Sequence, residues 1–264
     1  MADDAAEIAP EPSKLGTREY WDQVYEREVG NFDERGDVGE VWFGMDAVES
    51  VVDWIQDDAR LPKHLSVVDI GCGNGVSLVE LARVGFKSLL GIDYSEPAIE
   101  LARKVAAADE LDIDYQVFDF INDDVSALQN DKNRFPFDLC IDKGTYDAIS
   151  LAQNSASARA AYVRQVHALC SQAVKPRPPS DDDDENADEE EEDDDDDRRR
   201  KLSPRTTGLF IITSCNWTND ELKAAFASHF TTYAVIKYRV FEFGGKKGSS
   251  ISTVIFAPKP PSEL

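Results

Sequence analysis

Hydrophobic positions follow two alternating patterns from about residue 65 onward. Short apolar runs rich in β-branched residues predict strands at residues 65–70, 86–92, 113–118, 137–142 and 209–214. Between and after them, apolar positions at helical spacing predict helices at residues 76–84, 96–108, 158–174 and 220–230. Such alternation is typical of a parallel sheet with helices on both faces, a doubly wound α/β fold.

The C-terminal part departs from this alternation. Apolar runs at residues 233–243 and 250–256 are joined by a short loop rich in Gly and Lys. Because that loop is too short to hold a crossover helix, the two strands are predicted to pair as an antiparallel hairpin. The expected sheet is therefore mostly parallel and ends in an antiparallel hairpin.

The residues before the first strand predict two helices. An amphipathic helix is expected from Thr17, as its N-cap, through Tyr25, and a second helix from Asp46 to Ile55. The stretch from Val29 to Gly39 holds three glycines and several charges, so it is predicted to be a loop.

Two segments are predicted to be disordered. Residues 1–14 are polar, and residues 175–205 hold prolines, a long acidic run and a cluster of Arg and Lys. The second segment buries too little apolar area to offset the entropy of ordering it, and it falls between a helix and a strand, where insertions are tolerated. We expect a single domain over residues 15–264 that carries this acidic insert.

Charge restricts the partners. The chain has 52 acidic and 28 basic residues, and 15 of the acids lie within residues 181–197, which leaves 37 acids against the 28 bases elsewhere. Without a basic stripe, a nucleic-acid partner is not expected, whereas a basic substrate such as a lysine-bearing protein surface suits an acidic domain. No run of 18 apolar residues exists, and the acidic N-terminus resembles neither a signal nor a transit peptide, so no membrane partner is expected.

Cysteine and histidine usage gives no sign of a disulfide framework or a metal site. Cys72, Cys140, Cys170 and Cys215 are widely separated and form no C-x-x-C pair, and the three histidines are not close to one another. A reducing, cytoplasmic setting is the simplest interpretation.

The sharpest motif follows the first strand, Asp69-Ile70-Gly71-Cys72-Gly73-Asn74-Gly75. Glycines let the backbone turn tightly and pass close to a ligand. A dinucleotide fingerprint needs its third Gly three residues after the second, and a P-loop needs Gly-Lys-Ser/Thr; neither is present. The spacing therefore favours the remaining common use, binding the methionine part and ribose of S-adenosylmethionine. The predicted cofactor residues in this loop are Asp69, Gly71, Gly73, Asn74 and Gly75.

Acidic residues end the next two strands. Asp93, followed by Tyr94, ends the second strand, where a carboxylate can accept hydrogen bonds from both ribose hydroxyls. Asp93 could instead be a capping residue for the helix that starts near Pro97. Asp119 follows the third strand and is placed to reach the adenine amino group, although residues 122–124 could take that place. We predict that Asp93, Tyr94 and Asp119 bind the nucleoside.

Residues 66–118 resemble the class I S-adenosylmethionine-dependent methyltransferases. Residues 15–21 (Leu-Gly-Thr-Arg-Glu-Tyr-Trp) and 39–43 (Gly-Glu-Val-Trp-Phe) resemble the N-terminal signature of the methyltransferases that modify lysine on translation elongation factor 1-alpha. Residues 137–149 (Phe-Asp-Leu-Cys-Ile-Asp-Lys-Gly-Thr-Tyr-Asp-Ala-Ile) resemble the motif after strand four of the same group. The resemblance covers nearly the whole chain except residues 1–14 and the acidic insert, and it implies a seven-stranded, Rossmann-like sheet.

The resemblance also implies roles at the carboxyl end of the central strand. In that family this position faces the methyl group and the incoming amine, so Asp142 is predicted to position or deprotonate the amine. The alternative is that Asp142 caps the helix that follows. Lys143, Gly144 and Thr145 are predicted to bind the substrate, and Lys143 could instead pair with a nearby carboxylate.

Aromatic residues in the N-terminal segment could roof the cofactor or line a lysine channel, since aromatic faces attract sulfonium and ammonium cations. Trp42 is assigned to the cofactor, and Trp21 and Phe43 to the substrate; Tyr25 belongs to the same group. The alternative is that these residues only pack in the core or in a lid. Trp217, after the fifth strand, raises the same question.

These observations predict a metal-free, direct methyl transfer to a lysine of elongation factor 1-alpha by a monomeric enzyme. Two alternatives remain open because fold and cofactor loop do not distinguish them. One is a small-molecule methyltransferase on the same fold. The other is a cofactor-binding scaffold without turnover whose acidic insert recruits a basic partner.

Overall fold

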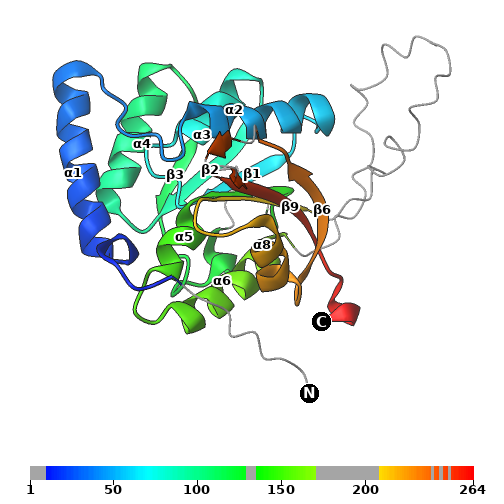
Figure 1. Ribbon diagram of the computed structural model, residues 1–264. Coiled ribbons are helices and arrows are strands. Elements are labelled where there is room, and N and C mark those ends of the chain that lie inside the picture. Colours follow the sequence, from blue (N-terminus) through cyan, green and yellow to red (C-terminus); the bar gives the residue numbers. More distant parts are fainter. Residues whose placement is uncertain (1–9, 129–134, 171–207, 239–240, 244–245, 249–250) are drawn as a thin grey trace, which may run out of the picture.

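A seven-stranded sheet forms the centre of the molecule, with a layer of helices on each face (Figure 1). The computed structural model describes residues 10–128, 135–170, 208–238, 241–243, 246–248 and 251–264. The strand order is β3-β2-β1-β4-β5-β9-β6. The strands are β1 (Ser66–Ile70), β2 (Ser88–Asp93), β3 (Asp114–Val117), β4 (Leu139–Lys143), β5 (Leu209–Ser214), β6 (Phe230–Ile236) and β9 (Ser252–Pro258).

The pairing confirms the predicted doubly wound arrangement. Strands β1 to β5 pair in parallel, and β9 pairs antiparallel with both β5 and β6. Every residue of β1 and β5 is buried, as expected for central strands covered on both faces. The strand order reverses at β1, because β2 and β3 lie on one side of it and β4 and β5 on the other. The carboxyl ends of β1 and β4 therefore meet at the switch point where open α/β sheets bind ligands.

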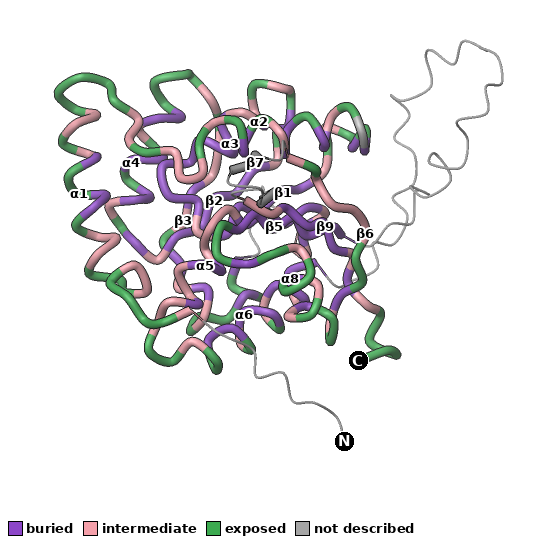
Figure 2. The backbone as a smooth tube through the Cα atoms, in the orientation of Figure 1, coloured by how far each residue is buried: buried purple, intermediate pink, exposed green. Residues whose placement is uncertain are grey.

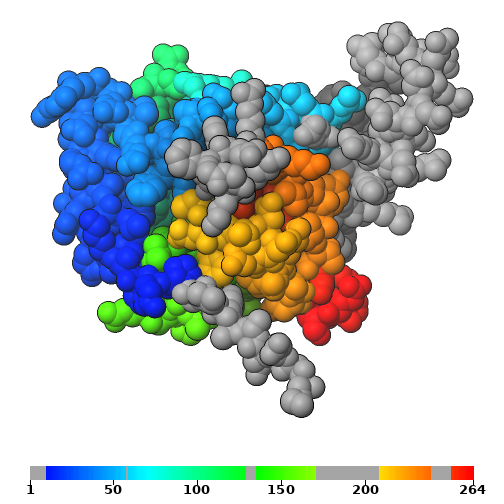
Figure 3. Space-filling view, in the orientation of Figure 1, coloured from blue at the N-terminus to red at the C-terminus, as the bar shows by residue number. Residues whose placement is uncertain are grey.

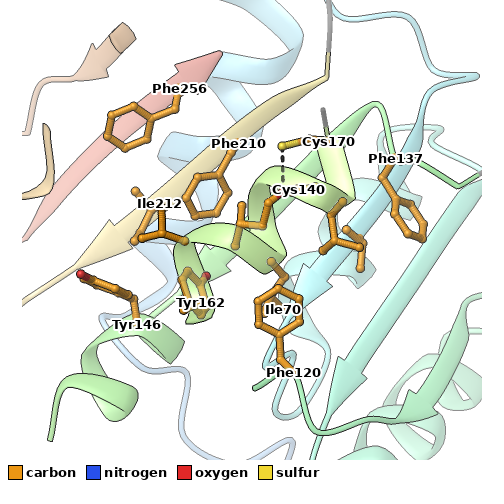
Figure 4. Close-up of a cluster of buried hydrophobic side chains, with 14 of the residues drawn as sticks. Ile70, Phe120, Phe137, Cys140, Tyr146, Tyr162, Cys170, Phe210, Ile212 and Phe256 are labelled. Carbon is orange, nitrogen blue, oxygen red and sulfur yellow. Dashed lines mark hydrogen bonds between the residues drawn. The ribbon is translucent and has the colours of Figure 1, made fainter. Parts of the chain in front are cut away.

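One helical layer carries α5 (Thr145–Ser150), α6 (Ser155–Cys170) and α8 (Asn219–Phe226). Aromatic side chains from this layer and from the sheet face below it gather in one cluster, and Figure 4 shows Tyr146, Tyr162, Phe210 and Phe256 within it. Cys140 on β4 and Cys170 at the end of α6 interact in the same cluster. All four cysteines of the chain are free thiols.

The opposite layer carries α2 (Met45–Asp53), α3 (Val76–Arg83) and α4 (Glu96–Ala108). A second apolar cluster fills the space between these helices and the sheet. Helix α1 (Arg18–Arg35) lies outside α4 and packs Tyr25 against Ala98, Leu101 and Val105. Burial follows these layers, because the central strands are buried and the exposed positions lie on the outer sides of helices, in loops and on the edge strands β3 and β6 (Figure 2).

Shorter elements complete the described chain: η1 (Lys14–Gly16), the π-helical turn η2 (Trp54–Asp58), η3 (Val125–Leu128), η4 (Pro261–Glu263), and a two-stranded ribbon of β7 (Phe241–Phe243) and β8 (Lys246–Gly248). No helix in the described ranges has the length and apolar character needed to cross a membrane.

Three boundaries differ from the sequence prediction. Helix α1 continues to Arg35, so the loop predicted from Val29 is wrong; Gly36 in the left-handed region ends the helix. The run at 233–243 is not one strand, because β6 ends at Ile236 and residues 241–243 pair with β8. Helix α8 ends at Phe226, since β6 already begins at Phe230.

The two segments predicted to be disordered have different outcomes. The acidic insert at 175–205 lies outside the described residues. Residues 10–14 are described, and the Ser13 backbone N–H donates to the carbonyl of Leu151 at 3.0 Å. The described residues just before η1 therefore lie against the segment around residue 150 (Figure 3).

Candidate functional site

A cavity of about 330 Å³ opens at the carboxyl ends of β1, β2, β3 and β4. Its walls come from the glycine loop after β1, the ends of β2 and β3, the segment after β4, the loop after β5, and the chain before α2. Most residues predicted for the site line it. These are Trp21, Trp42, Phe43, Gly71, Gly73, Asn74, Asp93, Tyr94, Asp119, Lys143, Gly144 and Thr145.

Two positions of the glycine loop, 71 and 73, suit only glycine. Gly71 and Gly73 have φ angles of 68° and 54°, in the left-handed region that a Cβ disfavours. A Cβ on Gly71 would collide with the Thr145 hydroxyl, and one on Gly73 would lie 2.5 Å from the Tyr25 hydroxyl. The loop therefore passes between α1 and the segment after β4 with no room for a side chain.

Asp93 connects the glycine loop to the end of β2. One carboxylate oxygen accepts from the Gly73 N–H at 3.0 Å, and the other accepts from the Ser95 N–H at 2.9 Å. Burial raises the pKa of Asp93 to about 6, against the lowering effect of these two backbone hydrogen bonds. A carboxylate has further lone pairs to offer, so Asp93 both organises the loop and presents an acceptor to the cavity.

Tyr94 and Asp119 extend the same wall. The Arg18 guanidinium lies over the Tyr94 ring, 5.6 Å from its centroid. Asp119 is tied into its own turn, where one oxygen accepts from the Ile121 and Asn122 backbones and the other from the Asn122 side chain at 2.9 Å. Asn122 lines the cavity beside Asp119. The predicted adenine-side group is therefore an Asp119–Asn122 pair.

A strap, defined as residues 36–44, crosses from α1 to α2 over the cavity. Asn74 donates from Nδ2 to the carbonyls of Val38 and Glu40, at 3.1 and 3.3 Å. Glu28 on α1 accepts from the Glu40 N–H at 3.2 Å. Lys143 donates to the Trp42 carbonyl at 3.3 Å. The glycine loop, α1 and β4 thus each hold the strap at one point.

Aromatic rings of the strap and α1 form a roof. Trp21 stacks on Tyr25 with centroids 6.1 Å apart, and meets Trp42 edge-on at 5.2 Å. Trp21 donates its indole N–H to the Leu15 carbonyl at 2.7 Å, and Phe43 touches the position of a Cβ on Gly144. All four rings line the cavity, so the roof presents aromatic faces to any cation inside.

Asp142 is not placed where a direct role with the amine needs it. Its carboxyl is fully buried and accepts from the Thr145 and Tyr146 N–H groups, at 2.8 and 2.9 Å, and from the Tyr162 hydroxyl. Asp142 does not line the cavity. These hydrogen bonds are the ones expected of the alternative weighed from the sequence, in which Asp142 satisfies the first N–H groups of α5 and so positions Lys143, Gly144 and Thr145.

Lys143 faces the cavity from the end of β4. Burial lowers the pKa of its ammonium, while Asp69 and Asp142 oppose that shift. Its hydrogen bond runs to the Trp42 carbonyl, so the role supported by this geometry is to hold the strap. Thr145 donates its hydroxyl to the Ile70 carbonyl at 2.7 Å, which ties the start of α5 to β1.

Besides Asp142, three predicted or considered residues lie outside the cavity wall. Asp69 is buried within β1, and Gly75 packs closely against Tyr115 and Ala102 beneath the loop. Trp217 is buried and donates its indole N–H to the Ser150 hydroxyl at 3.2 Å. Their contacts are those of the core, and the glycine loop reaches the cavity through residues 71–74 alone.

The sequence interpretation missed several lining residues. Asp147 in α5, with Cys215 and Asn216 after β5, forms the wall opposite the strand ends β2 and β3. Leu151 and Ala152 close the cavity beneath the N-terminal turn, where Gly16 approaches the Leu151 backbone. A carboxylate five residues after Asp142 was a detectable signal, whereas the contact between residues 16 and 151 needs the folded chain.

The cavity suits a nucleoside linked to a small cationic group. The loop has no side chain at Gly71 and Gly73, and it lies beside a buried carboxylate, Asp93, whose oxygens can accept further hydrogen bonds. Tyr94 and Phe118 offer flat surfaces for a base, and the roof offers aromatic faces for a cation. These features fit S-adenosylmethionine, the cofactor expected from the sequence.

Sequence comparisons with known proteins identify methyltransferases as the relatives of this chain. A family model described as a methyltransferase domain matches residues 61–254. The chain is 38% identical to EEF1A lysine methyltransferase 2 of Homo sapiens, over 93% of this chain and 87% of that protein. It is 35% identical to the protein-lysine N-methyltransferase efm4 of Schizosaccharomyces pombe, over 94% of this chain and 95% of that protein.

Two solved structures show the same fold at low identity. An S-adenosylmethionine-dependent methyltransferase from Anabaena variabilis gives a TM-score of 0.56 at 12% identity, covering 95% of this chain and 98% of that one. The N-methyltransferase NodS from Bradyrhizobium japonicum, in complex with S-adenosyl-L-homocysteine, gives 0.55 at 13% identity, covering 90% and 98%.

Proposed function

The chain belongs to the methyltransferase-domain family, and within it to the protein-lysine N-methyltransferases related to EEF1A lysine methyltransferase 2 and efm4, and from this premise we propose that it methylates a lysine of translation elongation factor 1-alpha. The methyl donor is S-adenosylmethionine. The substrate assignment rests on relatives that match nearly the full length of the chain and carry that substrate or protein lysine in their names.

One observation carries the proposal on the structural side. The segment Lys143-Gly144-Thr145, together with Asp147, lies on the cavity wall across from Asp93. A site that only stored the cofactor would need the Asp93 side alone. Here a second wall remains for an acceptor, and aromatic rings from the strap roof both.

Some residues of the cavity are proposed to bind the methyl donor, and others to accommodate the lysine that accepts the methyl group. Residues 71–73 and Asp93 are proposed to hold the nucleoside and methionine parts, and the bound cofactor supplies an electrophilic methyl carbon on its sulfonium. Trp42 and Phe43 exclude water and face the cations. The bound cofactor would supply this methyl carbon to a neutral lysine nitrogen; the carbon–sulfur electron pair would leave with the sulfur, and the methylammonium would later release its proton to water.

Labelling tests the proposed function directly. The purified protein is incubated with tritiated S-adenosylmethionine and purified elongation factor 1-alpha, and peptide mass spectrometry locates the label. We expect label on one lysine with the wild-type protein and a large loss with Asp93→Ala. Label that appears only in a metabolite fraction would favour a small-molecule methyltransferase. Cofactor binding without transfer to any fraction would favour a scaffold.

Further features remain proposals from the sequence. We propose one catalytic domain over residues 15–264, a monomeric state, a cytoplasmic location, and no nucleic-acid or membrane partner. Light scattering coupled to size-exclusion chromatography tests the monomer, and a dimer mass would contradict it. Fractionation of cells that express the protein tests the location.

A further inference from the structure

Asp147 lies on the cavity wall and has no part in the cofactor scheme above. We propose that its carboxylate binds the ammonium group of the incoming lysine, an inference that rests on the proposed function. Asp147 is in the first turn of α5, and its side chain is only 5% exposed. A lysine that reached it would lie beyond the strand ends that carry Gly73 and Asp93.

The strand order places Asp147 on the acceptor side. From β1 the sheet runs one way to β2 and β3, whose ends carry Asp93 and Asp119. It runs the other way to β4 and β5, whose ends lead to Asp147 and Cys215. A nucleoside on the first side directs its methyl-bearing end toward the second, so the amine approaches from the β4–β5 side.

The other carboxylates in the described cavity wall have different tasks. Asp93 holds the glycine loop, Asp119 holds its own turn, and Glu40 belongs to the strap. Asp142, the sequence-based choice, is enclosed beneath α5 with no exposed surface. On the β4–β5 side of the part of the cavity that the structure describes, Asp147 is the acidic side chain.

The surroundings make a counter-charge necessary there. Ala148, Leu151 and Ala152 line the adjoining wall, together with Phe43 of the roof. An ammonium that enters such an apolar space loses hydration, and a carboxylate within contact distance compensates that cost. Before transfer the ammonium must release one proton to solvent, because only the neutral nitrogen has the lone pair that attacks.

Two hydrogen bonds fix the direction of the carboxylate. The Ser214 hydroxyl donates to one oxygen, and the Cys215 N–H donates to the other at 2.9 Å. The Cys215 thiol and the Asn216 N–H also act on this carboxyl, so an ammonium would share its two oxygens with these donors. They also define the competing structural role, since Asp147 could serve only to hold the turn after β5. Ser214→Ala therefore provides the matched control, because it removes one of these hydrogen bonds and keeps the charge.

Binding of two forms of the substrate separates these roles. With S-adenosylhomocysteine saturating, so that no turnover occurs, calorimetry measures the affinity for elongation factor 1-alpha that carries either the labelled lysine or methionine at that position. We expect wild-type protein to prefer the lysine form about tenfold. Asp147→Asn should reduce that preference to less than twofold while its cofactor affinity stays within twofold. Ser214→Ala should keep the preference.

The outcomes that overturn the inference are distinct. A lysine preference retained in Asp147→Asn, or one lost equally in Ser214→Ala, would make Asp147 only a turn residue. If Asp147→Asn does not fold, Asp147→Glu replaces it, because the longer side chain displaces the charge by one methylene; an unchanged lysine preference there would also overturn the inference. Failure of the proposed function is detected separately, in the labelling experiment, where the wild-type protein would place no label on elongation factor 1-alpha.

Discussion

The hydroxyl oxygen of Tyr25 lies 2.5 Å from the position that a Cβ on Gly73 would take. Helix α1 therefore touches the glycine loop directly, although 48 residues separate the two positions. Because Tyr25 also stacks on Trp21, the loop, the helix and the aromatic roof form one contact chain. A side chain at residue 73 would therefore displace Tyr25 and disturb the glycine loop, helix α1 and the aromatic roof together.

We expect Gly73→Ala to weaken S-adenosylmethionine binding at least tenfold in calorimetry and to lower the melting temperature by a few degrees. The methyl group meets Tyr25 and must also adopt a φ of 54°, where L residues are strained. Gly30→Ala is the matched control, because Gly30 lies within α1 with nothing within 4 Å of its Cβ position. That variant should gain about 1 kcal/mol of stability. Equal behaviour of the two variants would contradict this account.

Removal of the Asn74 side chain should loosen the strap. Asn74→Ala deletes the hydrogen bonds to the Val38 and Glu40 carbonyls and leaves both without that partner. We expect faster cofactor dissociation in stopped-flow fluorescence and faster tryptic cleavage after Arg35, beside the strap. Asn122→Ala is the control for the cleavage measurement alone, since Asn122 lines the cavity without holding the strap. Unchanged cleavage in Asn74→Ala would show that the strap does not depend on this contact.

Local pattern was enough to predict the sheet and many of the residues that line the cavity at the ends of β1, β2 and β3. The strands β1, β2, β4 and β5 are mostly apolar runs, and each strand from β1 to β5 ends near chemistry-bearing residues, so their order along the chain maps onto one edge of the sheet. Gly71, Gly73 and Asp93 followed from spacing alone. Their roles depend on backbone geometry that the residue types themselves impose.

The acceptor side depended on contacts that no local pattern contains. Asp142 and Asp147 lie in one short motif, Asp142 near the end of β4 and Asp147 in the first turn of α5. Which of them faces the cavity depends on Tyr162, which lies 20 residues beyond Asp142 and takes up its carboxylate in the core. The N-terminal turn likewise reaches Leu151 only in the folded chain. Helix α1 was underestimated because its second half carries charges that cover few apolar neighbours.

Buried carboxyls should make the protein less stable as the pH rises. Burial raises the pKa of Asp69 to about 7, although Lys143 lowers it, and an unfolded chain titrates this group near 3.9. The folded state therefore holds the proton more tightly, so the stability is fully present below pH of about 4 and is lost as the pH rises through about 7. We expect the melting temperature to fall between pH 5 and 8, and Asp69→Asn to reduce that fall. Asp53→Asn, at an exposed position of α2, should leave the slope unchanged.

The replacement of Asp93 by Ala and the replacement of Asp142 by Ala should lower methyl transfer for different reasons. Asp93→Ala removes a charge-assisted acceptor from the cavity, so cofactor affinity should fall by roughly 1.5–3 kcal/mol, and the melting temperature should fall less than in Asp142→Ala because Asp93 accepts from two backbone N–H groups and from no buried hydroxyl. Asp142→Ala leaves the buried Tyr162 hydroxyl and two backbone N–H groups at the start of α5 without their acceptor, which should cost roughly 3 kcal/mol of stability. Its loss of turnover should follow from displacement of Lys143 and Thr145, so cofactor affinity should fall as well. Calorimetry and thermal unfolding on both variants distinguish these patterns. An Asp142→Ala protein with unchanged melting temperature and cofactor affinity but lost methyl transfer would return Asp142 to a direct role with the amine.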